Sequence, residues 1–184
     1  MKLQEAYNII KQSRHIFTPR EISKFEFKIS DLVSVDYPLY ETLAHLWIRL
    51  YKSLPQKELI PSPNVFDSYN HNCAATWIIT CKTIPPPELM PYNISNAIYS
   101  YSNDTLEMLW VRVCHTLPPP LLQHNSTIMN GFGYTCAMIW IKECRTIPPD
   151  ELLHASYIKN KYGETCADIW ANEIGGNIPP VLLV

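Results

Sequence analysis

The apolar positions of the chain follow a pattern that returns at a nearly constant interval. Tryptophan marks it at Trp47, Trp77, Trp110, Trp140 and Trp170, which are 30, 33, 30 and 30 residues apart. Around Trp140, Cys136 and Cys144 lie four residues to either side, so these three share one face of a helix. A period in this range is typical of stacked repeats, each of which buries its apolar face against its neighbours. The pattern therefore predicts an array of helical repeats.

Each unit reads as a long helix, a proline corner and a short helix, followed by an irregular loop. A threonine or asparagine stands where the long helix needs an N-cap, because its side-chain oxygen accepts from an unpaired backbone N–H. These residues are Thr42, Asn72, Thr105, Thr135 and Thr165. Glycine or asparagine two residues earlier, as at Gly133 and Asn70, predicts a left-handed turn. A basic residue closes the long helix, and Ile/Leu-Pro-Pro then leads into the short one.

We therefore predict an all-α fold, an α-solenoid of about five and a half helix–turn–helix repeats of roughly 30 residues. Residues 1–34 lack the tryptophan but fit the second half of the unit, which indicates a degenerate N-terminal capping repeat. The five tryptophan repeats are expected at 35–64, 65–94, 95–127, 128–157 and 158–184, in one continuous domain.

The stretch Ile158-x-Asn160-x-Tyr162-Gly163-x-Thr165 leads into a predicted buried helix. This entry resembles that of an ankyrin repeat, although the period is about three residues below the usual 33 and the second helix is shorter. The units are also similar to the ankyrin-like Trp/Pro-Pro repeats of phage-type proteins. The resemblance implies protein binding through the repeat tips and the concave face, without catalysis. A phage origin would make a host defence protein the partner, and inhibition of that protein the activity.

Composition and charge narrow the classes of partner. The formal net charge of −2 gives no overall attraction to nucleic acid or to a membrane. No stretch approaches the roughly 18 apolar residues of a membrane-spanning helix, and Lys2 and Glu5 interrupt any signal-peptide core. We expect a cytoplasmic protein, in the host cytoplasm if the source is viral, and no membrane partner.

The aromatic residues near the turns are the first candidates for contact with a partner protein, because tyrosine is favoured at binding hot spots. The unrepeated residues beside them are candidates for specificity. Together the candidates are Tyr69, His71, Tyr99, Tyr101, Ser102, Phe132, Tyr134, Lys161 and Tyr162. The alternative is that each ring packs onto its own helix as a hydrophobic staple.

Two other functional classes remain open. A column of basic residues at the helix ends could follow a phosphate backbone, and helical repeats do read single-stranded RNA. Its members are Arg49, Lys52, Lys82, Arg112 and Arg145. An enzyme is the remote alternative, since no phosphate-binding glycine loop, nucleophile elbow or zinc-protease helix is present. The cysteines follow the tryptophan spacing instead of forming Cys-x-x-Cys pairs, so we expect neither a metal site nor a cofactor.

Overall fold

The computed structural model describes residues 1–34, 40–90, 98–99, 103–123 and 127–183. The chain divides into two compact units, Met1–Tyr92 and Asn93–Val184, called here the N-terminal unit and the C-terminal unit. The described residues are mostly helical, which confirms the all-α class, whereas the solenoid and the single continuous domain stay predictions. None of the described helices is both long enough and apolar enough to cross a membrane.

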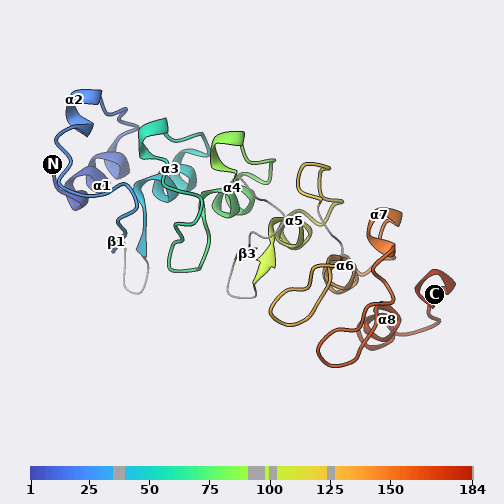
Figure 1. The fold of residues 1–184 in the computed structure, drawn as a ribbon. Helices are drawn as coiled ribbons and strands as arrows, with labels where there is room; N and C mark the ends of the chain where they lie inside the picture. The colour runs from blue at the N-terminus through green and yellow to red at the C-terminus, as the bar shows by residue number, and fades with distance from the viewer. Residues whose placement is uncertain (35–39, 91–97, 100–102, 124–126, 184) are drawn as a thin grey trace. The chain divides into compact units, whose positions relative to one another are not determined.

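The N-terminal unit is built on three helices that lie side by side, α1 (Leu3–Gln12), α3 (Leu43–Tyr51) and α4 (Cys73–Cys81) (Figure 1). Its shorter elements are α2 (Pro19–Ile22) and the 3₁₀ helices η1 (Lys57–Leu59) and η2 (Pro87–Leu89). Strands β1 (Val33–Ser34) and β2 (Tyr40–Glu41) form a small antiparallel pair in which Val33 faces Glu41. The predicted capping segment therefore supplies α1, which packs against α3.

The C-terminal unit repeats this plan with α5 (Leu106–Cys114), α6 (Cys136–Cys144) and α8 (Cys166–Glu173) packed in succession. Its short helices are α7 (Asp150–Leu153) and η4 (Pro180–Leu182). Strands β3 (Ile98–Tyr99) and β4 (Asp104–Thr105) pair antiparallel, with Ile98 opposite Thr105. Within this unit the loops before α6 and α8 project from one side of the row of long helices, and α7 lies on the opposite side (Figure 1).

All five long helices from α3 onwards begin at the predicted N-cap. In each, the side-chain oxygen of the cap accepts the backbone N–H three residues later, as Asn72 does from Ala75 at 2.9 Å. The capping oxygen satisfies a backbone N–H that has no partner within the helix. These caps fix where each helix starts.

The long helices α3 to α6 end at a residue in the left-handed conformation, which glycine usually provides. Here the predicted basic residues adopt it, with φ of 47° at Lys52, 54° at Lys82, 53° at His115 and 56° at Arg145. After α4, α5 and α6 this left-handed residue lies three residues before the first proline of the Pro-Pro pair. The predicted basic residue therefore lies at the end of the long helix, and the chain has already turned before it reaches the prolines.

Each unit has a hydrophobic core of its own. One leucine is buried in each of η1, η2, α7 and η4, namely Leu59, Leu89, Leu152 and Leu182. In the C-terminal unit, Leu152 and Leu182 join Met138 and Ile141 of α6. In the N-terminal unit, Leu59 packs with Ile10 of α1 in the same core cluster. A single helical turn thus suffices to close each corner, because one leucine anchors it.

Candidate functional site

Three loops share one architecture, in which an aspartate or asparagine side chain organises the backbone. Asn130 Oδ1 accepts the backbone N–H groups of Phe132 and Tyr134, both at 3.0 Å. Asn160 and Asp67 do the same in their own loops, at 2.9 Å for every bond. The predicted left-handed turn residues are confirmed, with φ of 61° at Asn70, 80° at Gly133 and 83° at Gly163. These loops are held from within, so the residues at their tips have fixed positions.

The aromatic residue at each tip is exposed. The exposed fraction is 51% for Tyr69, 40% for Phe132 and 63% for Tyr162. A hydrophobic staple would bury its ring against the first turn of the helix. Rings that are this exposed leave a large part of their apolar surface available to another molecule.

In the C-terminal unit the tips of two successive loops meet around one lysine. Lys161 Nζ lies 4.8 Å from the ring centre of Phe132 and 5.1 Å from that of Tyr162. It also lies 3.5 Å from the carbonyl oxygen of Gly131. We call Phe132, Lys161 and Tyr162 the tip cluster. Cation–π attraction to two rings holds the ammonium group at the surface.

Close packing of the loop backbones supports the tip cluster. A Cβ atom added at Gly133 would lie 2.6 Å from the backbone nitrogen of Lys161. Glycine is therefore needed there both for its positive φ and for its lack of a side chain. The equivalent Gly163 has open space around it. The loop before α6 thus rests directly on the loop before α8.

Other candidate residues have different environments. Tyr134 is half-buried, with its ring 5.3 Å from Lys142 Nζ, and Lys142 is ion-paired with Glu173. Tyr134 therefore contributes to packing between α6 and α8. Tyr99 lies in β3, opposite Asp104. Tyr101 and Ser102 lie outside the described residues.

In the N-terminal unit, Tyr69 and His71 border a hollow of about 260 Å³ next to α4. Its wall includes Arg49 and the buried Asp67, whose carboxylate lies 3.8 Å from His71 Nδ1. Burial lowers the pKa of His71 against the opposing charge of Asp67. His71 is therefore neutral at pH 7, and the hollow carries the charges of Arg49 and Asp67.

His45 lies beneath this loop and is fully buried. Its Nε2 lies 3.0 Å from the carbonyl oxygen of His71, and its Nδ1 lies 2.7 Å from Thr42 Oγ1. Burial lowers the pKa of His45 to about 4. A neutral ring with the proton on Nε2 satisfies both contacts, since it donates to the carbonyl and accepts from the hydroxyl. His45 thus joins α3 to the loop that presents Tyr69.

Part of the basic column is occupied by partners within the protein. Arg49 pairs with the buried carboxylate of Glu41, and Arg112 donates to Asp104 at 2.8 Å and also to Glu143. Arg145 donates to the backbone carbonyl of Glu173 at 2.8 Å. Lys52 and Lys82 are exposed at their helix ends. The arginines of the column therefore tie elements together inside each unit.

The buried thiols are poor nucleophiles. Burial raises the pKa of Cys73 and of Cys166 to about 12, and that of Cys136 well above its ordinary value. Since the thiolate is the reactive form, these cysteines are inert at neutral pH. Within the described ranges, no group of three His, Cys, Asp or Glu side chains could hold a metal ion.

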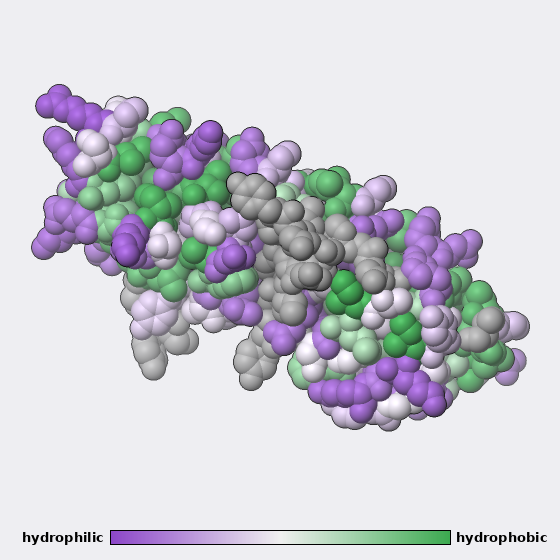
Figure 2. Space-filling view, viewed as in Figure 1, coloured by the Kyte–Doolittle hydropathy of each residue, from purple (hydrophilic) through white to green (hydrophobic). Residues whose placement is uncertain are grey.

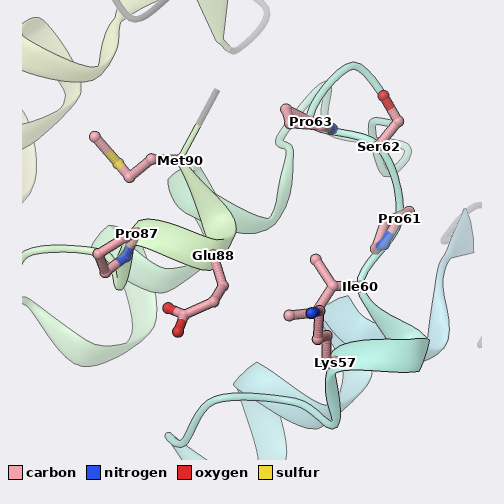
Figure 3. A pocket seen from close by; sticks show the side chains of 8 residues that line it. All are labelled: Lys57, Ile60, Pro61, Ser62, Pro63, Pro87, Glu88 and Met90. Carbon is pink, nitrogen blue, oxygen red and sulfur yellow. The ribbon is translucent and has the colours of Figure 1, made fainter. Parts of the chain in front are cut away.

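The structure also contains a groove that the sequence pattern did not single out. A hollow of about 480 Å³ between η1 and η2 is lined by Ile60, Met90 and a series of prolines, with Lys57 and Glu88 at its edges (Figure 3). A hollow of about 410 Å³ in the C-terminal unit is lined by Leu153 and Val181. Ile60 and Leu153 occupy the same position relative to Trp47 and Trp140. The sequence signal that could have identified these hollows is an apolar residue 13 positions after the tryptophan, as at Ile60, Met90 and Leu153.

Figure 2 shows hydrophobic side chains at the surface among hydrophilic ones in both units. Comparison with protein-family models, with curated proteins and with solved structures gave no match. The function therefore has to be argued from the residues and their geometry.

Proposed function

We propose that the protein is a non-catalytic scaffold of ankyrin-like helical repeats that binds another protein through its loop tips. In this role it acts as an adaptor or as an inhibitor that covers a surface of its partner. The site of action is the cytoplasm, and a phage protein of this kind would act against host defence. Three recurring local features support the repeat interpretation: the N-cap, the left-handed helix end and the side-chain-organised loop.

The observation that carries the proposal is the tip cluster. Exposed aromatic rings on internally bonded loops supply large apolar contact area with little conformational entropy to lose on binding. Phe132 and Tyr162 are such rings, and Asn130 and Asn160 hold their loops. The nucleic-acid alternative is less well supported, because Arg49 and Arg112 already pair with carboxylates.

The test is a tagged pull-down from a lysate of the source organism or its host, at two salt concentrations and with nuclease, read by mass spectrometry. We expect one stoichiometric protein that survives nuclease and is lost with the double variant F132A/Y162A. Tyr157→Ala is the matched control, since Tyr157 is 62% exposed and Tyr162 is 63% exposed in the same unit.

Each outcome separates the candidate surfaces. Loss of the partner with Tyr157→Ala but not with F132A/Y162A would place binding at the hollow of the C-terminal unit, which Tyr157 lines with Leu153 and Val181, and would overturn the proposal. Material released by nuclease or by moderate salt would favour nucleic acid bound through Lys52 and Lys82.

A further inference from the structure

Lys161 differs in its surroundings from cations that are ion-paired within the protein. Arg49, Arg112 and Lys142 each have a carboxylate partner in the protein. Across the described part of the chain, no carboxylate pairs with the Lys161 ammonium group, and its polar contact is a carbonyl oxygen at 3.5 Å. A positive charge is therefore held at the surface without a carboxylate paired to it.

The two rings hold this charge and leave one side of it open. Ring faces attract a cation through their negative quadrupole, so Phe132 and Tyr162 restrict the lysine side chain before any partner arrives. They also remove water from part of the ammonium group, which strengthens its attraction to an arriving anion. Restricting the side chain in advance lowers the entropy lost on binding. The tip cluster is thus prepared to receive a single anionic group.

The surroundings of the cluster indicate what carries that anion. Phe132, Tyr162 and the exposed Met129 offer apolar surface on the same two loops. The carboxylate of Glu164 is held by the side chains of Asn160 and Asn172, and Asp168 is exposed in the next helix. Both carboxylates belong to the segment that directly follows Lys161, so a chain of phosphates along this segment would be repelled, whereas a single carboxylate beside an apolar residue matches the lysine and its two rings.

We infer that the tip cluster recognises an acidic side chain, aspartate or glutamate, that adjoins an apolar residue on the surface of the partner protein. This inference rests on the proposed function and adds the chemistry of the partner. Lys161 contacts the carboxylate, while Phe132 and Tyr162 contact its apolar neighbour.

The test is selection of a displayed random peptide library on the full-length protein at low salt, followed by affinity measurement on the enriched peptides. We expect enrichment of Asp or Glu next to an apolar residue. Affinity for the best peptide should fall about tenfold with Lys161→Met, consistent with loss of one desolvated charge pair. Lys161→Arg should retain most of it, and Lys159→Met, which removes an exposed charge two residues away, should change it less than about twofold.

The outcomes distinguish this inference from the proposed function. Peptides that require Phe132 and Tyr162 but lack an acidic residue, and that bind Lys161→Met equally well, would overturn the inference and leave the scaffold proposal standing. Enriched peptides that bind F132A/Y162A unchanged, or no enrichment at all, would count against both. An oligothymidine of about 15 nucleotides serves as the competing probe. If it bound the protein in a way that depends on Lys161, the ligand of the tip cluster would be nucleic acid and not an acidic peptide.

Discussion

At the scale of the residue, the tryptophans have a polar role as well as an apolar one. Trp77 Nε1 donates to Thr83 Oγ1 at 2.9 Å, and Trp140 donates to Thr146 Oγ1 at the same distance. Trp47 and Trp110 make equivalent bonds to the hydroxyl groups six residues later. This bond ties the helix to the chain beyond its left-handed end, and it explains why a hydroxyl residue follows the helix in the repeated motif.

The last tryptophan lacks this partner. Glycine occupies the position six residues after Trp170, and the buried indole N–H of Trp170 has no hydrogen-bond acceptor in the part of the chain that the structure describes. A buried donor without a partner costs about 1–3 kcal/mol. The terminal repeat therefore carries a local defect that the others avoid.

This difference predicts that replacing tryptophan with phenylalanine destabilises the protein more at Trp140 than at Trp170. Trp140→Phe should lower the free energy of unfolding by about 0.5–1.5 kcal/mol more than Trp170→Phe, because it removes a formed hydrogen bond and leaves Thr146 unpaired. Urea unfolding of both variants measures the difference. Equal costs at the two positions would show that the indole–hydroxyl bond contributes nothing net.

A second residue-scale prediction concerns His45. Its pKa is about 6.5 in the unfolded chain and about 4 in the folded state, so the unfolded state binds a proton at higher pH. The stabilisation is complete above about pH 7 and is lost as the pH falls from about 6.5 to about 4, by up to about 3 kcal/mol. Urea midpoints between pH 4 and pH 8 should show this loss.

The variant His45→Gln isolates that contribution. Burial raises the pKa of Glu41, which changes stability in the opposite direction, and lowers that of His71. Since these groups remain in His45→Gln, subtraction of its pH profile from that of the parent gives the His45 effect. A parent and variant with parallel profiles would contradict the assignment.

At the scale of the element, the loops before α4, α6 and α8 share one arrangement of hydrogen bonds. One side-chain oxygen fixes two backbone donors in each loop, and a left-handed residue completes the turn. Local sequence is enough to predict such a loop, because every group involved lies within five residues. Contact between one loop and the next depends on tertiary packing, as the position of Gly133 against Lys161 shows.

Substitution of two glycines distinguishes the contribution of local backbone conformation from that of packing between the loops. Gly163→Ala should cost about 1 kcal/mol, because alanine disfavours positive φ but meets open space there. Gly133→Ala should cost at least about 1 kcal/mol more, since its Cβ would clash with the backbone of Lys161. Thermal unfolding of the two variants checks this order. A smaller cost at Gly133 would mean that the two loops do not rest on each other.

At the scale of the whole molecule, the structure consists of two compact units of similar plan. In each, successive long helices pack side by side, and single leucines anchor the short helices beneath them. The net charge of −2 is small, and ion pairs such as Arg112–Asp104 neutralise charges within a unit. Attraction of a partner must therefore come from local surfaces such as the tip cluster, since the overall field is weak.

Much of this molecule follows from local sequence. The N-caps, the turn residues with positive φ and the short helices were predicted, because each depends on residues within about one helical turn. The positions of the tip aromatics in the loops follow for the same reason. The small strand pairs β1–β2 and β3–β4 were not predicted, since two-residue strands leave no periodic signal.

Tertiary structure decided the rest. Arg49 and Arg112 looked like free cations in the sequence, yet each meets a carboxylate from outside its own helix, as with Glu41 and Asp104. Lys161 looked like one charged residue among several, yet loop packing places it between Phe132 and Tyr162. Whether a charge is paired or open depends on groups that are distant along the chain, and these become neighbours only when the chain folds.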